Sequence, residues 1–167
     1  RFTQSGIKEI ILTGINTASY GKDFEDYDFS NLLQDIFSVL PKDVKIRISS
    51  IEVTEISDKL IAVLKEHEDK LCQHLHIPLQ SGSDEVLRWM GRKYTTAYYN
   101  HRISQIRNLF PNINITTDIM VGFGNKTLAI FNESKAFIEK MAFGEMHVFP
   151  YSKRPNTKAY RFDNHLD

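Results

Sequence analysis

Residues 74–80 read HLHIPLQ and carry the pattern that decides the fold. Successive side chains of a strand point to opposite faces. One face of this segment is apolar and the other polar, the first with Leu75, Ile77 and Leu79 and the second with His74, His76 and Gln80. A strand covered by helices on both faces would be apolar throughout. The segment therefore predicts a strand with helices on one side and a polar interior on the other.

Three other segments repeat this alternation, namely Val44–Ser49, Ile113–Val121 and Glu145–Phe149. Their polar sides carry Arg47, Ser49, Asn114, Thr116, Asp118 and His147. Their apolar sides carry Val44, Ile46, Ile48, Ile113, Ile115, Ile119, Met146 and Val148. A fifth segment, Ile7–Thr13, is apolar without a clear alternation. We expect the polar side chains to converge on one interior.

Amphipathic helical segments separate these strands. Their apolar faces lie within Leu32–Leu40, Ile56–Leu64, Ser83–Met90, Thr95–Phe110 and Phe131–Met141. Strands that alternate with helices form βαβ units, with parallel pairing and right-handed crossovers. The fold class is therefore α/β, with five parallel strands and helices outside. An open sheet and a partial TIM-like (βα) barrel both fit this order, and the polar interior favours the barrel.

Composition limits the function classes. The 167 residues suffice for one domain, and the 41% hydrophobic and 25% charged residues are typical of a globular protein. The formal net charge of zero gives no general surface for polyanions. No apolar run has the length of a membrane span. The single Cys72 fits a reducing, cytoplasmic setting and cannot by itself supply three thiolates to an iron–sulfur cluster.

Several polar residues also have a purely structural interpretation. His74 and His76 could be core histidines, and Ser83 could cap the helix that begins at Asp84. Asp118 could pair with Arg47 inside the barrel. Cys72 is interpreted as a small buried hydrophobic residue.

Active sites of such barrels gather at the C-terminal ends of the strands. These ends are rich in glycine, small and hydroxyl residues, and they lie at Gly14–Asn16, Ser49–Glu52, Gln80–Ser83, Val121–Gly124 and Pro150–Ser152. Such residues let a ligand approach the backbone closely.

The segment HLHIPLQSGSDEVLRWMGRKYT (residues 74–95) resembles the most distinctive segment of the radical S-adenosylmethionine methylthiotransferase family. Four further segments resemble that family in the same order: IILTGINTASYGKD (10–23), RISSIE (47–52), TTDIMVGF (116–123) and HVFPYSKRPNT (147–157). Among its branches, they are most similar to the one that methylthiolates threonylcarbamoyladenosine beside the tRNA anticodon. The sister enzymes act on isopentenyladenosine in tRNA or on a ribosomal-protein aspartate.

The resemblance implies that residues 1–151 are units two to six of a radical barrel. Residues 152–167 would be an exit segment toward an RNA-binding domain that follows. The first unit, with a Cys-x-x-x-Cys-x-x-Cys loop, would be missing. The parent protein would use S-adenosylmethionine and 4Fe–4S clusters on tRNA in the cytoplasm, whereas this chain alone would be catalytically silent. The expected cofactor-binding residues are Gly14, Asn16, Ser49, Gln80, Ser81 and Asp118.

The sequence departs from the family pattern at several positions, among them Val53, Asn156, the helix start at 128–130 and one turn. Residues 122–127 read GFGNKT where Gly-Phe-Pro-Gly-Glu-Thr is usual, so Lys126 replaces a glutamate. Two other classes stay open: a barrel that binds phosphate at Gly122–Asn125, and a non-catalytic truncated barrel used as a binding module. Because the first strand would lack its neighbour, we also expect self-association through the exposed edge Ile7–Thr13.

Overall fold

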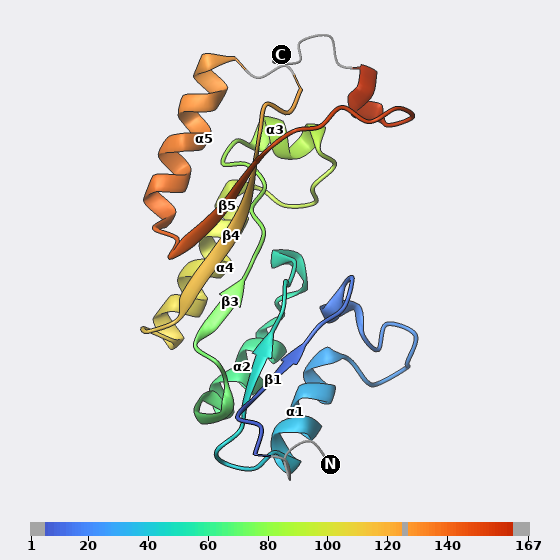
Figure 1. The fold of residues 1–167 in the computed structure, drawn as a ribbon, viewed down its shortest axis with the longest axis vertical. Helices are drawn as coiled ribbons and strands as arrows, with labels where there is room; N and C mark the ends of the chain where they lie inside the picture. Colours follow the sequence, from blue (N-terminus) through green and yellow to red (C-terminus); the bar gives the residue numbers. More distant parts are fainter. Residues whose placement is uncertain (1–5, 125–126, 162–167) are drawn as a thin grey trace.

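The computed structural model describes residues 6–124 and 127–161 (Figure 1). Its strands are β1 (Glu9–Leu12), β2 (Lys45–Ile48), β3 (His74–His76), β4 (Asn114–Val121) and β5 (Glu145–Pro150). Its α-helices are α1 (Phe29–Val39), α2 (Asp58–Glu66), α3 (Asp84–Trp89), α4 (Thr96–Leu109) and α5 (Leu128–Met141). Lys126, which stands where the family pattern has a glutamate, lies outside the described residues.

All strand pairs are parallel. β1 pairs with β2, and β3, β4 and β5 form a second sheet in that order. Isolated parallel bridges, Ile46↔Leu71 and Ser50↔His76, join the two sheets. Figure 1 shows the strands following one another along the molecule, with α1 and α2 beside the first two and α4 and α5 beside the last three. The predicted α/β class with five parallel strands and flanking helices is confirmed.

The core lies between the strands and the helices. Ile46 and Ile48 of β2 and Ile115 and Ile119 of β4 are buried, as the alternation predicted. They pack in one cluster with the apolar faces of the helices, which include Leu33, Phe37, Leu60, Leu64, Ile103 and Ile106. Burying each such side chain contributes roughly 1.5–3 kcal/mol. This cluster fixes which face of each strand remains available to a ligand.

Local capping sets where most helices begin. The Asp28 carboxylate accepts from the Asn31 backbone N–H at 3.0 Å, and the Asn31 side chain accepts from the Asp28 N–H at 3.1 Å. Ser57, Thr95 and Thr127 cap α2, α4 and α5 through their hydroxyls. These caps satisfy backbone donors that have no partner inside the helix.

The prediction that Ser83 caps α3 through its side chain is wrong. Ser83 occupies the N-cap position without a side-chain cap hydrogen bond. Its hydroxyl instead donates to Glu133 Oε2 at 2.9 Å and so ties the start of α3 to α5.

The apolar face expected at the C-terminal part of the chain is only partly covered. Met141 is buried and Phe137 and Ile138 are half-buried, but Phe131 is 44% exposed. Met146 and Val148 of β5 were expected to face helices, and they are 42% and 57% exposed. β5 has only β4 beside it among the described strands, which explains why its side chains remain accessible. Within the described residues, no helix has the length and apolarity needed to cross a bilayer.

Candidate functional site

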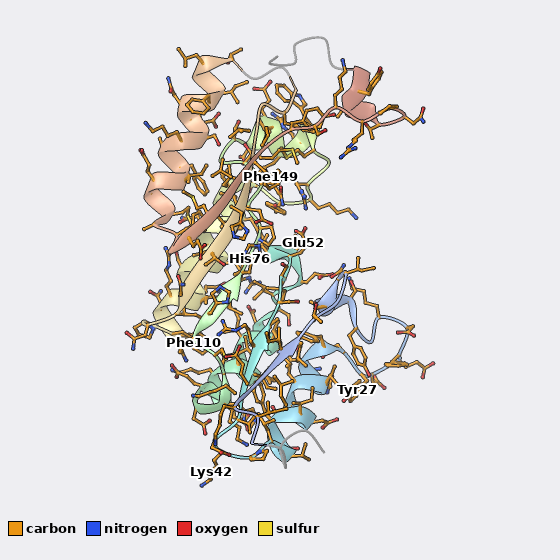
Figure 2. The ribbon with its side chains drawn as sticks, in the orientation of Figure 1. Tyr27, Lys42, Glu52, His76, Phe110 and Phe149 are labelled. Carbon is orange, nitrogen blue, oxygen red and sulfur yellow. The ribbon has the colours of Figure 1, made fainter. Side chains whose placement is uncertain are left out.

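The polar face of the strands carries a cluster centred on Asp118. His76 Nε2 lies 3.3 Å from Asp118 Oδ2, and His147 Nδ1 lies 3.5 Å from Asp118 Oδ1. The three residues come from β3, β4 and β5, and the register places Asp118 beside His147. The two imidazole rings are 6.0 Å apart. His76 is labelled in the middle of the molecule in Figure 2.

Thr116 extends this cluster toward the start of the strands. Its hydroxyl makes hydrogen bonds with His76 Nδ1 at 2.9 Å and with His74 Nε2 at 3.0 Å. Burial lowers the pKa of His74, and nearby Arg47 and His76 add to the effect. His74 Nδ1 is buried without a partner among the described residues. Four of the six side chains expected on the polar face of the third and fourth strand segments, namely His74, His76, Thr116 and Asp118, are therefore joined in one row.

Arg47 does not pair with Asp118, so that structural interpretation is wrong. Its guanidinium binds Glu9 of β1 with two hydrogen bonds, Nε to Oε1 at 2.6 Å and a terminal nitrogen to Oε2 at 3.2 Å. The Arg47 guanidinium lowers the pKa of the Glu9 carboxyl. Cys72 is a buried free thiol, as predicted, and burial, followed by the Glu9 carboxylate, raises its pKa.

Gly14, Asn16 and Ser49 lie together at the ends of β1 and β2. Thr17 joins them, because its Oγ1 lies 3.1 Å from Ser49 Oγ and would be the nearest atom to a Cβ added at Gly14, at 3.5 Å. Asn16 donates to Glu55 Oε1 at 3.3 Å. A cavity of about 610 Å³ opens here, lined by residues that include Gly14, Asn16 and Thr17.

Glu55 is a residue of this site that sequence reasoning missed. Its Oε1 also accepts from Ser19 at 2.9 Å and from Lys22 at 2.6 Å, so it fixes the loop that carries Asn16. Its side chain is 12% exposed, and Oε2 is buried without a partner among the described residues. Glu55 lies in a short 3-10 turn after β2, outside the strand alternation that guided the prediction.

The strand alternation that placed Gln80 on the polar face with His74 and His76 does not continue as far as Gln80. The register pairs Gln80 with Ile119, whereas uninterrupted pairing from His76↔Thr116 would pair it with Met120. One extra residue is therefore accommodated after Ile77, and Gln80 has a φ of 69°. Its backbone N–H donates to the Asp118 carbonyl at 2.8 Å.

Ser81 lies apart from the strand-end group. It is fully buried, and its hydroxyl lies 3.5 Å from that of Ser134 in α5. The structure thus brings Gly14, Asn16 and Ser49 together, links Gln80 to Asp118 through the backbone, and packs Ser81 against a helix.

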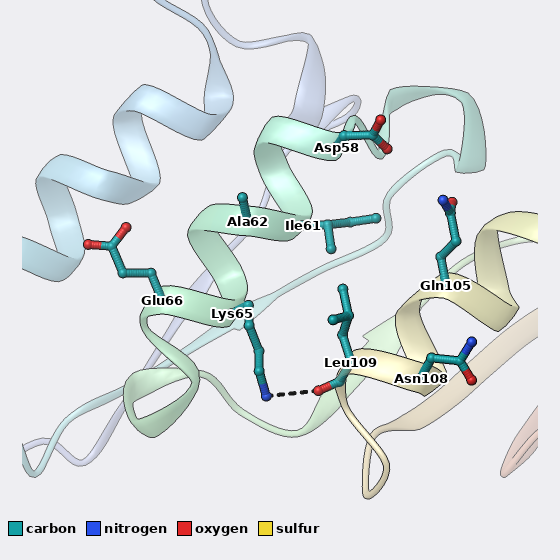
Figure 3. Close-up of a pocket in the computed structure, with 8 residues that line it drawn as sticks. All are labelled: Asp58, Ile61, Ala62, Lys65, Glu66, Gln105, Asn108 and Leu109. Carbon is teal, nitrogen blue, oxygen red and sulfur yellow. Dashed lines mark hydrogen bonds between the residues drawn. The ribbon is translucent and has the colours of Figure 1, made fainter.

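A second cavity lies outside the sheet, between α2 and α4 (Figure 3). It has a volume of about 690 Å³, and Lys65 Nζ donates to the Leu109 carbonyl across it at 2.9 Å. None of its lining residues is a predicted site residue, and it faces away from the polar row. It is a groove between two helices, apart from the predicted site residues.

The residues present do not fit an iron–sulfur cluster. Such clusters are held by several cysteine thiolates. The sequence has one cysteine, and the described residues contain no group of three or more His, Cys, Asp or Glu side chains placed to hold a metal. The strand-end cavity, whose lining includes the polar side chains of Asn16, Thr17 and Ser19, fits a small ligand that makes hydrogen bonds.

Sequence comparison shows what this chain resembles. It is 44% identical over 167 residues to the threonylcarbamoyladenosine tRNA methylthiotransferase MtaB of Bacillus subtilis (strain 168), covering 100% of this chain and 37% of that protein. It is 42% identical over 158 residues to MtaB of Thermotoga maritima, covering 95% and 36%. It is 40% identical over 157 residues to the tRNA-2-methylthio-N(6)-dimethylallyladenosine synthase of Desulfitobacterium hafniense, covering 93% and 35%. The chain thus spans little more than a third of these relatives.

Solved structures share the fold. Coproporphyrinogen III oxidase (HemN) from Escherichia coli, a radical SAM enzyme, superposes with a TM-score of 0.66 at 16% identity, over 89% of this chain and 32% of that one. The archaeal Methanocaldococcus infernus Elp3 gives a TM-score of 0.62 at 13% identity, over 91% and 38%. The radical SAM superfamily profile matches residues 1–138. On this evidence the chain belongs to the radical SAM superfamily.

Proposed function

We propose that this chain forms the central barrel part of a tRNA methylthiotransferase that acts on threonylcarbamoyladenosine. The observation that carries the proposal is the 44% identity to Bacillus subtilis MtaB, which extends over all 167 residues. An enzyme for dimethylallyladenosine in tRNA is the second candidate, favoured by the 40% identity to the Desulfitobacterium hafniense synthase. Residues 1–151 would belong to the barrel and 152–167 to an exit segment, in a cytoplasmic enzyme whose partner is tRNA.

Within this proposal, S-adenosylmethionine would bind at the ends of β1 and β2. Gly14 would admit the ligand close to the backbone, and Asn16 and Ser49 would offer polar contacts. Glu55 would position Asn16, because its Oε1 accepts hydrogen bonds from Asn16, Ser19 and Lys22. S-adenosylmethionine would supply the radical only after it takes one electron from a reduced 4Fe–4S cluster, whose cysteine ligands the parent protein would provide from outside these residues. Gln80, Ser81 and Asp118 remain proposed cofactor-side residues.

The chain's own residues would position the substrate and exclude water. The row from His74 to His147 lines the face of the sheet opposite the apolar core, where a bound base would meet fixed polar groups. Since the residues described here do not fit the cluster, we propose that the isolated chain holds no four-iron cluster and is catalytically silent. Iron analysis of reconstituted protein tests this point.

A hybrid enzyme tests the proposed function. The segment of Bacillus subtilis MtaB that matches this chain is replaced by residues 1–167, and the hybrid is expressed in a strain that lacks MtaB. We expect mass spectrometry of digested tRNA to show the methylthio group on threonylcarbamoyladenosine. A hybrid that accumulates and binds iron like MtaB but yields no such nucleoside would reject the proposal. Product on dimethylallyladenosine would favour the second candidate.

A further inference from the structure

On the polar face of the sheet, β5 places the aromatic ring of Phe149 beside the Asp118 cluster. The register pairs Asp118 with His147 and Met120 with Phe149, so His147 and Phe149 lie on the polar face with Asp118. Phe149 is 36% exposed, although a ring of this size is usually buried. Phe149 is labelled on the upper half of the sheet in Figure 2. A flat apolar surface therefore adjoins a polar cluster on one face.

The polar cluster favours ligands that donate hydrogen bonds. Asp118 offers a carboxylate, and Glu145 Oε1 lies 4.0 Å from His147 Nε2 on the same strand. The Arg47 guanidinium, on β2, is paired with the Glu9 carboxylate of β1 and does not contact Asp118. Carboxylates accept hydrogen bonds and repel phosphate. This face therefore suits N–H groups of a ligand.

The side chains behind Asp118 hold it in place. His76 contacts one carboxylate oxygen, and its other ring nitrogen is bound to the Thr116 hydroxyl. The second carboxylate oxygen lies toward His147, whose side chain is 71% exposed. The buried part of the row thus orients the carboxylate, and the exposed part is accessible to a ligand.

We propose that Phe149, His147 and Asp118 recognise the base of a nucleoside. The Phe149 ring stacks against the base, and Asp118 and His147 accept its N–H groups. Stacking on aromatic side chains and hydrogen bonds to base edges are the usual means of recognising unpaired RNA bases. His76 and Thr116 are positioning residues. The identity of the base as threonylcarbamoyladenosine rests on the proposed function.

The first test uses the full 167-residue chain with ¹⁵N-labelled histidine rings. Nuclear magnetic resonance follows the rings during titration with threonylcarbamoyladenosine and with its N(6)-methyl derivative, which lacks the purine N–H. We expect the His147 and His76 signals to move, the signal of the exposed His101 on α4 to stay, and the derivative to bind about tenfold more weakly. The inference is overturned if the nucleoside does not bind, if it binds without moving His147, or if both ligands bind equally.

Variants test the two contacts separately. Phe149→Leu keeps apolar area but removes the ring, and Asp118→Asn removes the charge with little change of shape. We expect each to weaken nucleoside binding about tenfold. The matched controls Phe131→Leu, on the exposed part of α5, and Asp43→Asn, in an exposed turn, should bind as the parent chain does. Equal binding by Phe149→Leu and Phe131→Leu would contradict the stacking contact.

The two proposals fail in different ways. In one pair of results, the hybrid enzyme yields no methylthio product while the nucleoside still shifts the His147 ring signal of the 167-residue chain. That pair of results would reject the proposed function and support the base site. The opposite pair of results would reject the base site alone: the hybrid makes the methylthio product, but the nucleoside does not shift the His147 ring signal of the 167-residue chain.

Discussion

At the scale of single residues, the Arg47–Glu9 pair makes a small, pH-dependent contribution to stability. The side chains are 33% and 40% exposed, so solvent screens their attraction. We expect Arg47→Met to lower the free energy of unfolding at pH 7 by about 0.2–1 kcal/mol. Since Arg47 lowers the pKa of Glu9, this contribution is present above the unfolded pKa of about 4.3 and is lost as the pH falls through the folded pKa. Urea unfolding at several pH values measures it.

The matched variant Glu9→Gln should lose a similar amount at pH 7. A stability difference between Arg47→Met and the parent chain that stays constant down to the lowest pH would show that Glu9 is not the partner.

His74 should remain neutral at a pH where free histidine begins to protonate. Burial is the largest cause of its lowered pKa, and Arg47 and His76 add to it. Because the folded state disfavours the charged ring, stability should fall as the pH decreases from about 6.5 toward the folded pKa. His74→Gln should flatten this slope. Ring ¹⁵N shifts that report titration of His74 at or above the free value would contradict the expectation.

Residue contacts were only partly predictable. Alternation within β2, β3 and β4 predicted that Arg47, His76 and Asp118 lie on the polar side, but it could not choose the partner of Arg47. That partner is on β1, whose sequence shows no clear alternation, so the position of Glu9 depends on the register. Glu55 was missed because it lies in a turn, where no periodicity indicates direction.

At the scale of elements, the loop after β3 packs tightly on α5. A Cβ added at Gly82 would lie 2.4 Å from the Ser134 carbonyl oxygen, and the Gly82 N–H donates to Ser134 Oγ at 2.8 Å. We expect Gly82→Ala to destabilise the chain by about 1–3 kcal/mol in urea unfolding. Gly14→Ala is the control, since its nearest neighbour would be 3.5 Å away, and it should change stability by less than about 1 kcal/mol. Equal losses in both variants would contradict this packing.

Hydrophobic periodicity predicted the order and type of the elements. It did not predict the register between neighbouring strands or which apolar side chains other elements would bury. In the part of the chain that the structure describes, five strands and five α-helices lie where apolar and amphipathic segments predicted them. The extra residue before Gln80 shifts the pairing by one, which depends on the neighbouring strand and not on the segment itself. Phe131 shares the helical period of the core residues, yet its side chain is exposed. Burial of an apolar helix face depends on which element packs against it, and the sequence of the helix does not give this.

At the scale of the whole molecule, β1 is an edge strand of the described sheet, and Ile11 on it is 57% exposed. We propose that this edge pairs with a second copy of the chain. Light scattering over a dilution series should show a dimer that Ile11→Lys disrupts. Ile15→Lys, in the exposed loop after β1, should leave it intact. A monomer at every concentration would contradict the proposal.

The central claim is that function resides on the polar face of the sheet. The most direct measurement is the amount of methylthiolated nucleoside in tRNA from cells that carry the hybrid enzyme with Asp118→Asn or with Asp43→Asn. Asp118 lies between two histidines on the inner face, and Asp43 pairs with Lys8 at the surface. We predict that Asp118→Asn lowers the product at least about tenfold, whereas Asp43→Asn leaves it unchanged. Equal product from the two variants, at equal protein levels, would contradict the claim.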